Sequence, residues 1–270
     1  MSVLRKIPVS NHYAFSSVFT HDLEVTREFI SALIGKPISK VVIADREKVM
    51  EEVFEGKGIR FDVYLKDAEG ESFDLELQIS DERNIEKRVR YYQSILTADA
   101  LSKGERYRDL KDSYVIFICV GNDPIGLGKT VYEIENTIVS ASNRLFKDGM
   151  HSYIFNFSPV REASNDQVIE EMANYFYNDD VTGRLSERID EIVRELNENV
   201  TWREKVMTWE QEKEALAEIY FEKGKTRGIN EGLAQGKTEI ALAMLRKGFD
   251  VSVVKELTGL DEGDIRKLSN

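Results

Sequence analysis

The segment Ile59–Ile79, IRFDVYLKDAEGESFDLELQI, decides how the rest of the chain is interpreted. Apolar and polar residues alternate in both of its halves, which is the period of a half-buried β-strand. The apolar positions are Ile59, Phe61, Val63 and Leu65 in the first half, and Phe73, Leu75, Leu77 and Ile79 in the second. Between them, Lys66–Ser72 contains the Asp, Glu and Gly residues that suit a hairpin loop. The segment therefore predicts two antiparallel strands with one face on a core.

The register of this hairpin is restricted, because a slip of one residue would turn one apolar set outward. If Leu65 pairs with Phe73, the acid at Asp62 lies opposite Glu76. Neighbouring registers place Asp62 opposite Asp74 or Gln78. Like charges in such positions destabilise a sheet by about 0.2–1 kcal/mol, whereas a divalent cation between them reverses the sign because hard cations bind carboxylate oxygens. The hairpin alone is also compatible with a solvated polar face that happens to be acidic.

Composition restricts the protein class. The chain has 270 residues, enough for one large domain or for a domain with an appendage. Its one cysteine, Cys119, excludes a disulfide framework and favours a reducing compartment. The N-terminal stretch Met1–Phe15 lacks the apolar core of a signal peptide, and the longest apolar run, Tyr114–Val120, is too short to span a bilayer. We therefore expect a soluble, cytoplasmic protein with no membrane partner.

The net charge of −12 argues against passive adhesion of the whole protein to nucleic acid. One segment has the opposite charge balance: between Arg83 and Lys111 there are eight Lys or Arg and four Asp or Glu. This segment overlaps a helix expected over Glu82–Ser102, where apolar residues repeat at helical spacing (Ile85, Val89, Tyr92 and Leu96). Its Lys87, Arg88 and Arg90 could face phosphate groups. An ordinary solvated helix face has the same composition.

Further strands are expected on both sides of this helix. The run Tyr114–Val120, YVIFICV, is typical of a strand buried on both faces in the middle of a sheet. A strand, a helix and a strand in succession predict a crossover connection with helices covering the sheet. Upstream we expect a helix over Leu23–Ile34 and a strand over Lys40–Val49. Downstream, Val131–Ile138 and Tyr153–Phe157 are expected to add short edge strands.

The C-terminal part is helical in character. Glycines recur at every fourth position, Gly224, Gly228, Gly232 and Gly236, and each costs a helix interior about 1 kcal/mol relative to alanine. This stretch is therefore a weak helix or a hinge, or alternatively a stripe for close helix packing in a homo-oligomer. After it, Lys237–Asn270 suggests a small helix-turn-helix-like or protein-contact module. We divide the chain into a core over residues 1–160, a helical extension over 161–222 and a C-terminal module over 223–270.

Three stretches carry a resemblance to a known family: GKGIRFDV, then FDLELQ, then KRVRYYQSILTADALSKGERYRDLKDSYVIFI. Together they resemble the PD-(D/E)XK nuclease superfamily, and more closely its recombination-promoting nuclease (Rpn), or transposase-type, branch. The resemblance covers roughly residues 13–157. It implies an α/β fold of restriction-endonuclease type, with a central mixed sheet flanked by helices and a helical C-terminal extension. It also implies metal-dependent cleavage of DNA.

By position in these motifs, Asp62 is the acid of the second core strand and Glu76 is the acid of the third. Gln78 stands where the superfamily usually has lysine, a replacement that this branch tolerates. Members of the branch often carry a D-x-x-F-K-like pattern before the first helix. The corresponding stretch here runs from His12 to Ser17, HYAFSS, so an acid and a base of that pattern are missing.

The resemblance assigns chemistry to these positions. Asp62 and Glu76 would hold Mg²⁺ or Mn²⁺, with the backbone carbonyl of Leu77 as a further ligand. Such an ion lowers the pKa of bound water and neutralises developing charge. Gln78 cannot act as a base, but its amide can orient water or a phosphate oxygen. The positive charge of the missing lysine would come from Lys87, Arg88 or Arg90, the residues expected to bind DNA.

The sequence therefore predicts a Mg²⁺-dependent DNA endonuclease associated with recombination or mobile elements. One alternative is a catalytically degenerate nuclease fold that binds DNA or a protein. Another is a defence effector whose cleavage activity is regulated by its own C-terminal module.

Overall fold

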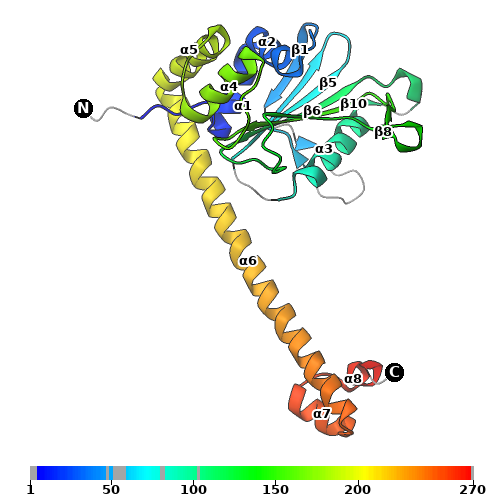
Figure 1. The fold of residues 1–270 in the computed structure, drawn as a ribbon. Coiled ribbons are helices and arrows are strands. Elements are labelled where there is room, and N and C mark those ends of the chain that lie inside the picture. The colour runs from blue at the N-terminus through cyan, green and yellow to red at the C-terminus, as the bar shows by residue number, and fades with distance from the viewer. Residues whose placement is uncertain (1–4, 47–48, 51–58, 80–82, 102–103, 269–270) are drawn as a thin grey trace. The chain divides into compact units, whose positions relative to one another are not determined.

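The computed structural model describes residues 5–46, 49–50, 59–79, 83–101 and 104–268. The chain forms two compact units, Met1–Val206 and Met207–Asn270. The first unit contains a six-stranded sheet in the order β1-β4-β5-β6-β10-β7 (Figure 1). Its strands are β1 (Val41–Arg46), β4 (Val63–Asp67), β5 (Ser72–Gln78), β6 (Ser113–Val120), β7 (Val131–Ile134) and β10 (Met150–Phe157). Parallel and antiparallel pairs occur together, which confirms the expected central mixed sheet.

Strands β4 and β5 form the hairpin that the sequence predicts. They are antiparallel, and Leu65 lies opposite Phe73, the register that brings Asp62 toward Glu76. The chain then crosses through α3 (Ile85–Ala100) to β6, which runs parallel to β5. The crossover connection is therefore confirmed. It places α3 above the strand that carries the predicted acids.

The first half of the hairpin is not one continuous strand. Residues Ile59–Arg60 form β3, which pairs with β2 (Val49–Met50) in a separate two-stranded sheet. The ladder to β5 starts only at Val63, because the backbone N–H of Asp62 donates to the Glu76 side chain. As a result Phe61 packs with the core under α3, whereas Val63 packs on the opposite face. The prediction that these apolar residues share one face is wrong for Phe61.

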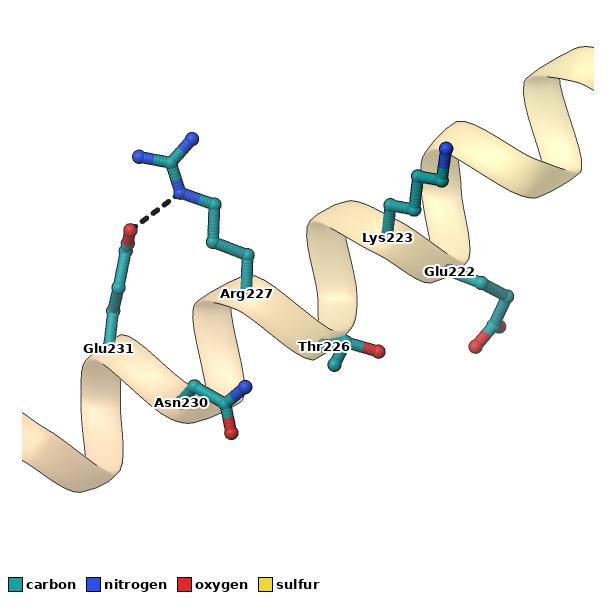
Figure 2. A pocket seen from close by; sticks show the side chains of 6 residues that line it. All are labelled: Glu222, Lys223, Thr226, Arg227, Asn230 and Glu231. Carbon is teal, nitrogen blue, oxygen red and sulfur yellow. Dashed lines mark hydrogen bonds and ion pairs between the residues drawn. The ribbon is translucent and has the colours of Figure 1, made fainter.

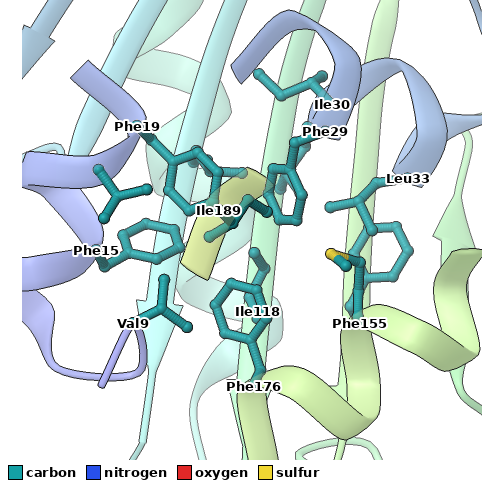
Figure 3. Close-up of a cluster of buried hydrophobic side chains, with 14 of the residues drawn as sticks. Val9, Phe15, Phe19, Phe29, Ile30, Leu33, Ile118, Phe155, Phe176 and Ile189 are labelled. Atoms are coloured by element: carbon teal, nitrogen blue, oxygen red, sulfur yellow. The ribbon is translucent and has the colours of Figure 1, made fainter. Parts of the chain in front are cut away.

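Four helices cover one face of the sheet: α1 (His12–His21), α2 (Leu23–Ile34), α4 (Gln167–Asn178) and α5 (Arg184–Glu198) (Figure 1). Their shared core is rich in aromatic rings (Figure 3). Phe19 stacks on Phe29 at 4.4 Å between ring centroids, and Phe29 on Phe176 at 5.9 Å. Helix α2 has the predicted bounds and ends at Gly35, whose φ of 66° is easily reached only by glycine.

Helix α3 covers the other face of the sheet. Its apolar residues, Ile85, Val89, Tyr92 and Leu96, pack against Phe61, Phe117 and Cys119. Gln93 fixes it further, donating to the carbonyl of His151 (2.7 Å) and accepting from the Ser113 hydroxyl (2.9 Å). The helix begins three residues later than expected, after Asn84. Ser80, which the sequence suggests as the N-cap of this helix, lies outside the described residues.

Strand β10 also corrects the sequence analysis. Tyr153–Phe157 was expected at an edge, but β10 lies between β6 and β7, and β7 is the edge strand on this side of the sheet. Both faces of β10 are covered, which is why Tyr153 through Phe157 are all buried. Short elements complete the unit: η1 (Tyr107–Asp109), β8 (Thr137–Ile138), η2 (Val139–Ala141) and β9 (Arg144–Leu145).

The second unit contains most of α6 (Val200–Arg246), followed by α7 (Val251–Thr258) and α8 (Glu262–Leu268). Ala241, Val254 and Ile265 form its small core. Helix α6 continues through all four glycines, and residues 210–235 are exposed. No helix in the described ranges is both long and apolar enough to cross a membrane.

The glycines should make α6 locally weak. A Cβ added at Gly228 or Gly232 meets nothing within 4 Å, so Gly228→Ala with Gly232→Ala should favour the helix by about 1 kcal/mol at each position. Limited proteolysis should cut the parent early between residues 224 and 236, and the double variant several-fold more slowly. Cleavage in the 121–130 loop serves as the control. Equal cleavage rates at α6 would show that the glycines do not control its opening.

Candidate active site

The structure brings Asp62 and Glu76 together through two hydrogen bonds that run in opposite directions. The backbone N–H of Asp62 donates to Glu76 Oε1 at 2.8 Å. The backbone N–H of Leu77 donates to Asp62 Oδ2 at 3.0 Å. Each acid is therefore held by the backbone beside the other, and the two carboxylates are fixed near the end of β5.

The polar row of β5 is buried. Asp74 is 0% exposed, Glu76 2% and Gln78 7%. They occupy alternate positions of the strand, on the face covered by α3, whereas Phe73, Leu75 and Leu77 pack on the opposite face. The interpretation as a solvated acidic face is therefore wrong. Only Asp62, at the break before β4, is partly accessible.

Burial changes the acidity of this row. It raises the pKa of Glu76 well above its ordinary value, and the negative charge of Asp62 acts in the same direction. The N–H of Asp62 and the Arg88 guanidinium oppose that shift. Burial also raises the pKa of Asp74 well above its ordinary value, and the negative charges of Glu76 and Asp62 raise it further. Full ionisation of all three acids therefore requires a compensating cation.

Asp74 is the least compensated of these acids. It lies beside Glu76 on β5, yet neither of its side-chain oxygens forms a hydrogen bond of normal geometry with any residue in the described part of the chain. A buried carboxyl whose polar neighbour is another carboxyl is costly to ionise. Sequence reasoning did not assign Asp74 to the site, although the period of two in DLELQ places it on the face of Glu76.

Among the three predicted phosphate-facing cations, Arg88 is the one that contacts the acids. Its guanidinium donates to Gln78 Oε1, lies 3.4 Å from Glu76 Oε2 and donates to the Tyr92 hydroxyl at 3.2 Å. Lys87 and Arg90 are exposed on α3. The sequence pattern places Tyr92 in the core. Its hydrogen bond with Arg88 could be anticipated only from the i, i+4 spacing of the two residues.

The stretch that corresponds to the D-x-x-F-K-like pattern lies within α1 rather than before the first helix. At the position of the missing acid is a histidine that faces the site. His12 begins α1, which Asn11 caps by accepting from the N–H groups of Tyr13 and Ala14. His12 Nδ1 lies 3.7 Å from Asp62 Oδ2.

The serines that follow His12 have structural roles. The Ser16 hydroxyl donates to the Tyr13 carbonyl. Ser17 accepts hydrogen bonds from Arg46 and Trp202. These serines stabilise α1 and supply neither charge of the D-x-x-F-K-like pattern.

The donor set suits a hard divalent cation with few protein ligands. Over the described ranges, no three or more His, Cys, Asp or Glu side chains gather closely enough to surround an ion. Asp62 and Glu76 nevertheless offer two carboxylates, each hydrogen-bonded to the backbone beside the other acid, and Mg²⁺ typically takes one or two and keeps several waters. The uncompensated charge around Asp74 is what such a cation would relieve. The pair therefore fits Mg²⁺ or Mn²⁺, with the carbonyl of Leu77 as a predicted further ligand.

A hollow on α6 does not form a comparable site. Its lining comes from consecutive turns of one helix, Glu222, Lys223, Thr226, Arg227, Asn230 and Glu231 (Figure 2). All six side chains are exposed, and Arg227 pairs with Glu231 at 2.6 Å. This is an ordinary solvated helix face.

Two family models match the chain. The model of the PD-(D/E)XK nuclease family transposase matches residues 9–223, and the model of the C-terminal HTH domain of the Rpn/YhgA-like nuclease family matches residues 234–270. The chain is also similar to the inactive recombination-promoting nuclease-like protein RpnE of Escherichia coli (strain K12), at 30% identity over 106 residues. That stretch is 39% of this chain and 32% of the relative. No solved structure matches the chain.

Replacing Asp74 should stabilise the metal-free protein. The pKa of Asp74 is higher in the folded state than in the unfolded state. Ionisation of Asp74 therefore has no effect on stability below its unfolded pKa of about 3.9, and it lowers the free energy of unfolding as pH rises above that value. Asp74→Asn should therefore raise the free energy of unfolding by about 1–2 kcal/mol at pH 7 and much less at pH 3.5. Urea denaturation with a chelator measures both values.

The matched control is Asp123→Asn. Asp123 accepts hydrogen bonds from the Gly128 N–H and the Tyr132 hydroxyl, and its pKa is below the ordinary value. Its substitution should lower stability at pH 7, where the carboxylate is ionised. A loss of stability in both variants at pH 7 would contradict the description of Asp74 as an uncompensated acid.

Proposed function

The chain belongs to the PD-(D/E)XK nuclease family transposases, and we propose that it is a metal-dependent DNA endonuclease acting in recombination or on mobile elements. The observation that carries this proposal is the pair of hydrogen bonds that holds the carboxylates of Asp62 and Glu76 beside each other's backbone. Gln78 follows Glu76 by two residues on the same strand. These three residues match the positions of the family's acids and of its usual lysine. The compartment we propose is the cytoplasm, in line with the single cysteine.

The mechanism assigns a task to each residue of the site. Asp62 and Glu76 would hold Mg²⁺ or Mn²⁺, which lowers the pKa of bound water and neutralises charge on the leaving oxygen. The Gln78 amide orients the attacking water or a phosphate oxygen. The backbone N–H groups of Asp62 and Leu77 hold the two carboxylates in place before substrate arrives.

DNA is the proposed partner of both units. Lys87 and Arg90 are exposed on α3 and would contact the phosphate backbone. The match to an HTH domain supports a further contact through the second unit. In α8, however, Arg266 pairs with Glu262 and Lys267 with Asp264, so this helix offers little unpaired charge to phosphate.

A second candidate function is a catalytically degenerate nuclease fold that binds DNA or a protein. The similarity to a relative described as inactive favours it, as does the histidine in place of an acid at His12. In this alternative the acid pair persists as part of the fold and performs no hydrolysis.

Nicking of supercoiled plasmid DNA separates the two candidates. The parent should nick DNA with Mg²⁺ or Mn²⁺ and not with a chelator. Asp62→Asn should reduce the rate by about 100-fold or more, because second-shell partners alone account for 10–100-fold. Asp180→Asn, which removes an exposed carboxylate after α4, is the control and should match the parent. No nicking by the parent with either metal would favour the degenerate alternative.

A further inference from the structure

A guanidinium reaches the polar row of β5 from α3. Arg88 donates to Gln78 Oε1, lies 3.4 Å from Glu76 Oε2 and donates to the Tyr92 hydroxyl. Its guanidinium carbon lies 5.0 Å from the ring centroid of Phe117 and 5.4 Å from that of Tyr92. The group is thus held by hydrogen bonds at its edge and by aromatic rings nearby. Its side chain keeps 24% of its surface accessible, so an incoming anion can still reach it.

The neighbours of Arg88 do not share this position. Lys87 and Arg90 are exposed, because residues one and two positions away point to other sides of a helix. Two residues fix the rotation of α3. Gln93 forms hydrogen bonds with β6 and β10, and Leu96 is buried. The fold therefore selects one cation of the basic helix for the acid pair and leaves its neighbours to solvent.

The reaction needs a charge that Gln78 cannot supply. Hydrolysis joins the OH of water to phosphorus, breaks one ester P–O bond and delivers the remaining proton to the leaving oxygen. Negative charge grows on the phosphate oxygens as the new bond forms, and a guanidinium binds such oxygens through its planar fork of donors. Arg88 keeps all of its protons throughout and acts only by charge and hydrogen bonding.

Resting on the proposed nuclease function, we propose that Arg88 is a catalytic residue that binds the scissile phosphate in place of the absent lysine. Before substrate and metal arrive, the same guanidinium neutralises Glu76. When Glu76 holds a metal ion, Arg88 would give up its contact with that carboxylate and turn its donors to the phosphate. Arg88 therefore competes with the metal and assists the reaction.

This competition gives a readout other than activity. Arg88→Gln should bind Mn²⁺ about three- to tenfold more tightly by calorimetric titration, because a like charge leaves the site. The same variant should lose about 100-fold in maximal nicking rate at saturating Mn²⁺ and DNA. Lys87→Gln removes one charge from the solvent side of the same helix. It should bind Mn²⁺ as the parent does and bind DNA more weakly.

Arg88→Lys keeps the charge and loses the fork. It should show the Mn²⁺ affinity of the parent and recover part of the rate, and thermal melts should show that both Arg88 variants fold. Unchanged or weaker Mn²⁺ binding by Arg88→Gln, or an unchanged maximal rate, would overturn the proposal while the parent still nicks DNA. A parent that binds no Mn²⁺ would instead overturn the proposed function and, with it, this role of Arg88.

Discussion

Glu76 is 2% exposed, and its side chain accepts a hydrogen bond from the backbone N–H of Asp62, whose carboxylate accepts one from Leu77. These two hydrogen bonds connect the break before β4 to the C-terminal end of β5. The first of them uses a backbone donor that would otherwise continue the ladder, so β4 begins only at Val63. The acid pair therefore determines the local path of the chain as well as its chemistry.

Strand β5 serves two different environments. On one face, Phe73, Leu75 and Leu77 belong to the aromatic core under four helices, the larger of the two cores beside the sheet. Its polar face lies under α3 and holds charge that the protein only partly compensates, through Arg88 on one side and backbone N–H groups on the other. Proteins commonly give up stability at such sites to obtain function. The raised pKa values of Asp74 and Glu76 express that cost.

Much of the fold follows from local sequence pattern. The alternation in Ile59–Ile79 predicted the hairpin, and the apolar run Tyr114–Val120 predicted a buried strand. The helix expected over Leu23–Ile34 has those bounds in the structure. The family and its mixed-sheet fold were also recognised correctly. The errors arose where tertiary contacts override local pattern. Phe61 changed face at a break made by a side-chain hydrogen bond, and β10 became interior because β7 pairs with its outer edge.

The site, like the fold, was predictable only where local pattern determines it. Period-two alternation and one register were enough to bring Asp62 to Glu76. Local pattern could not single out Arg88 from Lys87 and Arg90, because that choice depends on how α3 is rotated against the sheet. The burial of the polar row likewise depends on α3 covering it. Asp74 lies in the alternating stretch FDLELQ, but the family resemblance gives it no role.

A crystal of the parent protein grown with Mn²⁺ tests most directly whether the acid pair is a metal site. We expect an anomalous difference peak beside the carboxylates of Asp62 and Glu76, with Arg88 moved off Glu76 Oε2. If no peak forms at this pair and Arg88 stays on Glu76 at saturating Mn²⁺, the acid pair is not a metal site.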